Sequence, residues 1–266
     1  MIHWSGCSKP SDVVSDSFGY ELASSNFNGW ISWQRNLELL KRFEALPPKL
    51  LIFHTSRCGS TLAAKLLGQS PENRVFSEPR VLNAQFYQSP EKKNPFLVDL
   101  IRTLGLGASP PQKHLILKLP SYALLHAEPL REAFPEATFW LLSRDPLETL
   151  VSSMETPPKF LKTEEPLLDT HLSYLEKIYS QAAASLDLMD RTVLYSPDLA
   201  AILSACSDWC PPETDFTSAT TTHSKYPKQT FRPDGQSKRE RATFLQREGA
   251  HLRLASHFEA IKKAAD

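Results

Sequence analysis

The segment LIFHTSRCGSTLAAKLL, Leu51 to Leu67, runs from an apolar stretch through a short polar loop into a helical pattern. The run from Leu50 to His54 is typical of a buried strand, and Ser60 to Leu67 carries its apolar residues on one side, as an amphipathic helix does. In parallel α/β sheets, the loop between such a strand and helix binds anions at the N-terminus of the helix. The segment therefore predicts a phosphate-binding loop at 55–61.

The residues of this loop suit an anionic ligand. Gly59 lets the backbone approach a ligand closely, and Arg57 offers a planar charged group that matches phosphate oxygens. Ser60 and Thr61 offer hydroxyl donors at the start of the helix, where the helix dipole also favours an anion. The alternative is that a strand, a turn and a helix with Gly and Ser are ordinary features of an α/β protein. The segment alone leaves both interpretations open.

Further short apolar runs alternate with helical patterns along the chain. This alternation indicates a parallel sheet covered by helices on both faces. We therefore expect an α/β fold with a P-loop-type parallel β-sheet flanked by helices in a single domain. The expected strands are 50–54, 74–76, 114–118, 138–142 and 192–196, the expected helices are 60–67, 165–190 and 237–263, and 204–236 is expected to be a long loop.

Length and composition limit the class of protein. The chain has 266 residues, 41% of them hydrophobic, which is enough for one large domain. We expect residues 1–46, rich in Ser and Asn, to form an N-terminal cap on a domain at 47–266. Thirty basic and thirty acidic residues balance, so the net charge indicates neither a nucleic-acid nor a membrane partner. With no signal peptide, no apolar run of ~20 residues and no CxxC pair, we expect a cytoplasmic protein.

The loop differs from that of magnesium-dependent nucleotide triphosphatases. Their pattern, G-x-x-x-x-G-K-[ST], requires a Lys for the outer phosphates, and an Asp at a strand end helps to hold the metal. Here Gly59 directly precedes Ser60, one expected strand ends at Lys118, and another is followed by Arg144. Arg and Lys at these places, without metal ligands, predict a donor that needs no metal.

The loop SRCGSTL at 56–62 resembles the 5′-phosphosulfate-binding loop of sulfotransferases that use 3′-phosphoadenosine 5′-phosphosulfate. It is most similar to the Arg-containing form, R-S-G-[ST]-T-L, of the tyrosylprotein and carbohydrate sulfotransferases. Cys58 stands where the family usually has Ser. Because this position offers mainly its backbone N–H, we expect binding to be retained, and the thiol raises the hypothesis of redox-sensitive activity. The resemblance implies that the co-substrate is bound by Ser56, Arg57, Cys58, Gly59, Ser60 and Thr61.

A second motif, FPEATFWLLSRDPLETLVSSM at 134–154, resembles the family's 3′-phosphate-binding strand and helix. The resemblance implies that Arg144 and Ser152 hold the 3′-phosphate. Asp145 suits the N-cap and Glu148 completes a capping box, so the helix is expected to begin at once. Ser152 then lies about two turns on and returns to the face of Asp145. The alternative is a strand-end Arg in a salt bridge and a surface Ser, although two motifs in the family's order are stronger than either alone.

The segment RVFSEPRVLN at 74–83 resembles the part of the tyrosylprotein sulfotransferases that carries a general base. The match places the base at Glu78. We expect Pro79 to keep Glu78 extended at a strand end, and burial to raise the pKa of Glu78 toward the working pH. A solvated Glu, or one in a salt bridge with Arg80, is the alternative, and His54 beside the loop is an alternative base.

Lys118 ends the run HLILK and matches a family Lys that contacts the bridging oxygen and the leaving phosphate. A cation placed where charge develops stabilises such a transfer, so Lys118 and Arg57 join Glu78 as expected catalytic residues. The alternative for Lys118 is a solubilising residue at a strand edge. Lys238 and Arg239, after a basic loop, loosely match the family's C-terminal segment that covers the nucleotide, and a solvated basic face fits them equally well.

These observations predict a sulfotransferase that moves a sulfuryl group to a hydroxyl or amine of a small-molecule acceptor. The co-substrate is expected to be 3′-phosphoadenosine 5′-phosphosulfate, with no metal. One alternative is a small-molecule kinase of the same fold class that uses ATP and magnesium. The other is a nucleotide-binding protein without catalytic activity. The acceptor itself has no recognisable motif in the sequence.

Overall fold

The computed structural model describes most of the chain from residue 44 onward. The N-terminal cap expected at 1–46 lies almost wholly outside the described residues, as does the basic loop at 218–237. The described ranges are 44–79, 82–83, 85–86, 95–155, 168–217, 238–247, 249 and 251–265.

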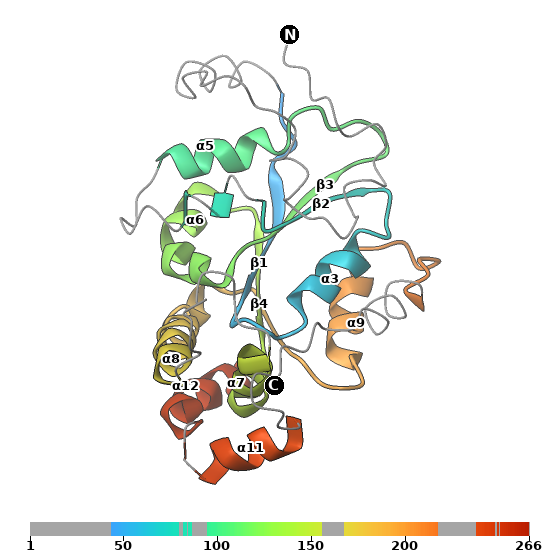
Figure 1. Cartoon of the computed structure of the whole chain (residues 1–266). Coiled ribbons are helices and arrows are strands. Elements are labelled where there is room, and N and C mark those ends of the chain that lie inside the picture. The colour runs from blue at the N-terminus through green and yellow to red at the C-terminus, as the bar shows by residue number, and fades with distance from the viewer. Residues whose placement is uncertain are drawn as a thin grey trace, which may run out of the picture.

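A five-stranded sheet forms the centre of the molecule, with the spatial order β2-β3-β1-β4-β5 (Figure 1). Every neighbouring pair of strands is parallel, as the alternation of strands and helices predicted. The five expected strands are all present, each within about two residues of its predicted bounds. They are β1 (Pro48–His54), β2 (Asn73–Ser77), β3 (His114–Lys118), β4 (Thr138–Ser143) and β5 (Arg191–Leu194).

The central strand β1 is apolar on both faces because both faces of the sheet are covered. Leu51 and Phe53 belong to one hydrophobic cluster, whereas Leu50 and Ile52 belong to a second cluster on the opposite face. All four side chains are fully buried. This two-sided burial explains why β1 reads as a continuous apolar run instead of an alternating one.

Two layers of helices enclose the sheet (Figure 1). α3 (Ser60–Leu67) and α9 (Ala200–Ser207) pack together over the cluster that contains Ile52. The helices on the other side enclose the cluster that contains Phe53. They are α5 (Pro95–Thr103), η2 (Ser121–His126), α6 (Ala127–Ala133), α7 (Pro146–Glu155), α8 (Leu168–Ala184), η4 (Leu186–Leu188), α11 (Lys238–Arg247) and α12 (Leu252–Lys263).

Three expected elements differ from the structure. The single C-terminal helix predicted at 237–263 is two helices, because Gly249 between them adopts a φ of 64° that a continuing helix does not allow. α9 was not predicted, and its last turn lies in the segment expected to be a loop. α8 is shorter than predicted and ends at Ala184. Within the parts that the structure describes, no helix is both long and apolar enough to cross a bilayer.

The strand order fixes where a ligand can bind. From β1 the chain passes over β3 to reach β2 at the edge, whereas the connection after β3 leads to β4 on the other side of β1. Ligands of open parallel sheets bind beyond the carboxyl ends of the strands, at the point where the connections diverge. In this sheet that point is the end of β1, where the predicted phosphate-binding loop begins.

Candidate functional site

The loop between β1 and α3 has an unusual backbone. Ser56, Arg57 and Gly59 adopt φ values of 73°, 51° and 81°, in the left-handed region that residues other than Gly rarely enter. Left-handed residues within a short loop turn successive N–H groups toward one side and form a concavity that binds anions. The first N–H groups of α3 have no acceptor within the helix and add to this concavity.

Gly59 is required at its position by geometry. Besides its φ of 81°, a Cβ atom built on Gly59 would lie 2.7 Å from a ring carbon of Tyr195 and 2.8 Å from the Cδ1 atom of Ile202. The backbone of the loop therefore packs directly against side chains that follow β5 and lie in α9. Gly59 was predicted to let the backbone approach a ligand closely. In the structure, the backbone at Gly59 closely approaches the side chains of Tyr195 and Ile202.

Buried hydrogen bonds attach the loop to β4. The N–H of Thr55 donates to the carbonyl of Leu142 (3.0 Å), and the Thr55 and Ser143 hydroxyl oxygens are 3.1 Å apart. The thiol of Cys58 donates to the same Leu142 carbonyl at 3.3 Å. Cys58 is fully buried, and burial raises the pKa of its thiol, so the thiol is neither accessible nor ionised. The structure therefore argues against the hypothesis of redox-sensitive activity.

Three of the predicted anion-binding residues meet beside the loop. The Nη2 atom of Arg57 donates to the carbonyl of Ser152 (3.3 Å), and the Nη1 atom of Arg144 donates to the carbonyl of Arg57 (3.3 Å). Arg144 and Ser152 are buried, with 9% and 4% of their surface exposed. The helix α7 begins at Pro146, directly after the cap residue Asp145, as predicted, and this brings Ser152 back to the loop.

Glu148 has a different partner from the one predicted. Its carboxylate accepts a hydrogen bond from Nε of Arg144 (2.6 Å) and forms an ion pair with Nη2 (2.5 Å). The capping box expected for Glu148 is therefore wrong, because the guanidinium is a stronger partner than a backbone N–H. Asp145 alone caps α7, and its Oδ1 atom accepts from the N–H groups of Leu147 (2.9 Å) and Glu148 (3.1 Å).

Glu78 follows β2 and forms an ion pair with Lys118 at the end of β3. The expected extended conformation is wrong, because Glu78 has a φ of 49°, and its N–H donates to the carbonyl of Lys118 (2.7 Å). The raised pKa is also wrong. Burial opposes the ionisation of Glu78, but the charge of Lys118 and the contact with His54 outweigh it and hold the pKa well below its ordinary value.

Lys118 is buried, with only 3% of its surface exposed, whereas the side chain of Glu78 remains 38% exposed. A buried ammonium requires an anionic partner, so this Lys is not the solubilising edge residue considered above. The register places Lys118 beside Ile52 of β1 and Ser77 of β2. Within the described ranges, no three His, Cys, Asp or Glu side chains gather as metal ligands would.

His54 ends β1 and faces the same carboxylate. Its Nδ1 atom accepts a hydrogen bond from the N–H of Ser56 (3.0 Å), so the proton of the neutral ring lies on Nε2, which is 3.5 Å from Oε1 of Glu78. Burial, together with the charge of Lys118, lowers the pKa of His54 to about 4. His54 is therefore neutral at pH 7, and its Nε2–H lies near Glu78 without forming a hydrogen bond of good geometry, which does not suit the alternative role of general base.

Tyr174 of α8 belongs to the site but was not predicted. Its hydroxyl forms a hydrogen bond with the hydroxyl of Ser121. Burial raises the pKa of Tyr174 to about 12, and the hydrogen bonds to Ser121 and Ser56 and the charge of Glu78 also act on it. The phenol is therefore neutral at pH 7 and within electrostatic range of Glu78. In sequence, Tyr174 is one of several aromatic residues in an amphipathic helix, and no pattern distinguishes it.

Lys238 and Arg239 are the remaining predicted binding residues. The structure places their backbone in the first turn of α11, and their side chains are not described. α11 packs beside α7, the helix that carries Ser152. The two residues therefore begin a helix that is adjacent to the predicted 3′-phosphate site, and their contact with a ligand stays a prediction.

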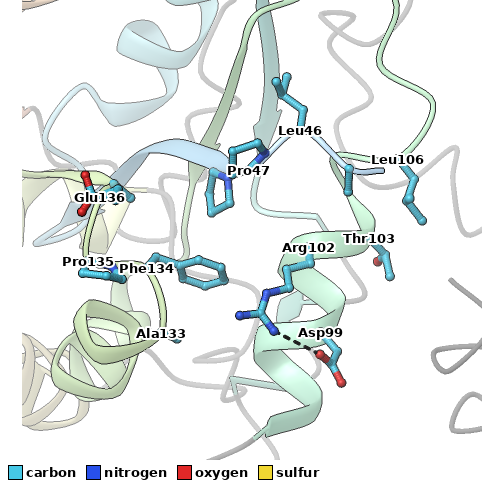
Figure 2. Close-up of a pocket in the computed structure, with 13 residues that line it drawn as sticks. Leu46, Pro47, Asp99, Arg102, Thr103, Leu106, Ala133, Phe134, Pro135 and Glu136 are labelled. Atoms are coloured by element: carbon cyan, nitrogen blue, oxygen red, sulfur yellow. Dashed lines mark ion pairs between the residues drawn. The ribbon is translucent and has the colours of Figure 1, made fainter. Parts of the chain in front are cut away.

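A pocket of about 480 Å³ lies at the amino ends of the strands, at the other end of the sheet from the loop (Figure 2). Leu46, Pro47 and Phe134 line it, and Arg102 of α5 forms an ion pair with Asp99 there (3.6 Å). The pocket borders the amino ends of β1 and β4. Since β1 has seven residues, the pocket is about 20 Å from the loop at the other end of the strand. It is separate from the candidate site.

Among solved structures, the chain is similar to the sulfotransferase STF1 from Mycobacterium tuberculosis H37Rv. The match has a TM-score of 0.52 and 17% sequence identity, and it covers 85% of this chain and 80% of that one. No protein-family model and no curated protein sequence matches the chain. The chain thus has the α/β fold of a sulfotransferase, which confirms the fold that the loop resemblance implied.

Replacing Gly59 with Ala tests the packing of the loop. We expect Gly59→Ala to lose more stability than Gly107→Ala, which is the matched control because Gly107 has a φ of 68° and open space around its Cβ position. The left-handed backbone alone costs about 1–2 kcal/mol with Ala, and only Gly59→Ala adds the contacts with Tyr195 and Ile202. Urea unfolding measures both free energies. Equal losses would show that the loop does not pack as described.

The depressed pKa of His54 predicts a pH-dependent stability. Since the folded value is about 4 and the ordinary value is 6.5, the unfolded chain binds a proton first as the pH falls. The stability contributed by neutral His54 is thus present above pH ~6.5 and is lost as the pH falls toward 4. His54→Gln does not titrate, so its free energy of unfolding is expected to fall less steeply over this window. Parallel pH profiles would contradict the assignment.

Proposed function

We propose that this protein is a sulfotransferase that uses 3′-phosphoadenosine 5′-phosphosulfate and modifies a hydroxyl or amine of a small molecule. The observation that carries the proposal is the meeting of Arg57, Arg144 and Ser152 beside a left-handed loop, on a sulfotransferase fold. The resemblance assigned these residues to two phosphates of one nucleotide. Their convergence from separate motifs supports that assignment.

The donor set fits such a co-substrate. The loop amides and the hydroxyls of Ser60 and Thr61 would hold the 5′-phosphosulfate, with Arg57 as the charged partner. Arg144 and Ser152 would hold the 3′-phosphate. Arg144 already binds one anion, the carboxylate of Glu148, through Nε and Nη2. A phosphate offers the same geometry with more charge, so it would displace Glu148, which is 45% exposed and free to swing into solvent.

Glu78 and Lys118 supply the groups needed for transfer. The bound co-substrate would provide a sulfuryl group whose bond to the 5′-phosphate breaks as the acceptor's oxygen or nitrogen bonds to sulfur. Glu78 is ionised and therefore able to take the proton that the acceptor loses. Lys118, buried at the end of β3, would stabilise the charge that develops on the leaving phosphate.

Arg144→Ala tests the 3′-phosphate site. We expect the affinity for adenosine 3′,5′-bisphosphate to fall about 10- to 100-fold, the equivalent of losing a charged hydrogen-bonding partner. Isothermal titration calorimetry measures the affinity. Arg253→Ala is the matched control, since Arg253 pairs with Glu176 on the surface of α12 and should leave binding unchanged. If both variants bind the bisphosphate as tightly as the wild type, the proposed site is wrong.

Glu78→Gln tests the general base. Sulfuryl transfer from the labelled donor to pooled hydroxyl and amine metabolites is expected to slow by about 10²- to 10⁴-fold. Mass spectrometry identifies the product and measures the rate. Glu72→Gln is the control, because Glu72 pairs with Lys113 at the amino edge of the sheet and should retain full activity. Unchanged transfer by Glu78→Gln would assign the base elsewhere, and no transfer by the wild type would favour a protein that only binds nucleotides.

A further inference from the structure

Two side chains approach one oxygen of the Glu78 carboxylate. Nζ of Lys118 donates a hydrogen bond to Oε1, whereas Nε2 of His54 lies 3.5 Å from the same atom and has no hydrogen-bond partner. The three residues end adjacent strands: His54 ends β1, Glu78 follows β2, and Lys118 ends β3. His54 and Lys118 are buried, whereas the side chain of Glu78 is 38% exposed. The two neighbours of Glu78 differ in how firmly they are held.

His54 is held in place by the loop. The N–H of Ser56 donates to Nδ1 (3.0 Å), which fixes both the orientation of the ring and the tautomer with a proton on Nε2. Only 4% of His54 is exposed. A short, buried ring in this arrangement is a neutral donor that stays beside Glu78.

The stem of Lys118 is buried, and its ammonium group is held by the ion pair with Glu78. Its ammonium group lies on a flexible four-carbon stem and is a point charge that pairs with whichever anion is within reach. In the structure that anion is Glu78. While the pair persists, Lys118 disfavours protonation of the carboxylate, so Glu78 is a weak base.

We propose that Glu78 has one permanent partner, His54, and one exchangeable partner, Lys118. When the donor binds, its anionic oxygens draw Lys118 away from Glu78, and the carboxylate, still oriented by His54, becomes the stronger base. The inference rests on the proposed function. It makes His54 a positioning residue, and it couples the strength of the base to the presence of the donor.

The other titratable groups around Glu78 do not change their protonation at pH 5–7, so they do not add to the proton uptake expected of Glu78. Besides His54 and Lys118, the phenol of Tyr174 approaches from α8, and the thiol of Cys58 lies in the loop that also faces Tyr174 and Lys118. Burial raises the pKa of Tyr174 and that of Cys58, so both are neutral at pH 5–7. Once Lys118 leaves, burial would dominate and raise the pKa of Glu78. A proton would then be taken up from solvent when no acceptor is present.

Proton uptake on binding tests the exchange. We would titrate the full chain with adenosine 3′,5′-bisphosphate at pH 5.5 to 6.5, in pairs of buffers that differ in ionisation enthalpy. The wild type is expected to take up more protons than Glu78→Gln, by as much as one per site, with the difference growing as the pH falls. The bisphosphate's own proton exchange is common to both proteins and cancels. Equal uptake by two proteins that both bind would overturn the inference.

Lys118→Met tests whether the extra proton uptake depends on the departure of Lys118 from Glu78. Without the ammonium, the carboxylate of Glu78 has no cationic partner to lose on binding, so proton uptake is expected to fall to the level of Glu78→Gln. Uptake equal to that of the wild type would overturn the inference. If the wild type does not bind the bisphosphate at all, the proposed function fails and the inference fails with it. Binding without extra uptake contradicts the inference alone.

Two variants of His54 test its positioning role. His54→Gln keeps a neutral N–H donor near the place of Nε2, whereas His54→Leu removes it. We expect kcat to stay close to that of the wild type in His54→Gln and to fall about tenfold in His54→Leu, which loses the donor that Glu78 would use once Lys118 has left. The pKa on the acidic limb of the kcat profile should rise only in His54→Leu. If His54→Gln is as impaired as His54→Leu, then His54 itself is the base and the inference is wrong.

Discussion

The left-handed turn after β1 is the constraint on which the rest of the site depends. Ser56, Arg57 and Gly59 leave the ordinary regions of backbone conformation within four residues. Bonds from Thr55 and Cys58 to β4, and the contact of Gly59 with Tyr195 and Ile202, hold the turn in place. A strained backbone persists only where its surroundings fix it. The sheet and α9 thus maintain a backbone conformation that the loop would not keep by itself.

The site also depends on how its charged side chains are paired. Two buried cations, Arg144 and Lys118, are each paired with a more exposed carboxylate, Glu148 and Glu78. Removing either carboxylate would leave a buried charge without a partner, which is costly. In the proposed function, each carboxylate holds its cation until an anion of the nucleotide replaces it. The same pairing would stabilise the free protein and keep the binding groups in place.

Much of the fold could be predicted from sequence because its signals are local. The continuous apolar run of β1 and the cap at Asp145 each depend on neighbouring residues, and both are confirmed. The misses depend on which partners the side chains find in the folded chain. Glu148 pairs with the guanidinium of Arg144 and not with a backbone N–H. Lys118, forty residues from Glu78 in sequence, lowers the pKa of Glu78, which was expected to be raised. Tyr174 lies near Glu78 because α8 packs against the segment that carries Ser121, and no local sequence pattern predicts that packing.

The most direct measurement compares two ligands. Adenosine 3′,5′-bisphosphate and ATP with magnesium would be titrated separately into the wild-type protein, and the bisphosphate titration repeated with EDTA. We predict that the bisphosphate binds more tightly than ATP and that EDTA leaves its affinity unchanged, because Arg57, Arg144 and Ser152 would form a site for a second phosphate without a metal. Tighter, magnesium-dependent binding of ATP would contradict the proposed function and favour a kinase.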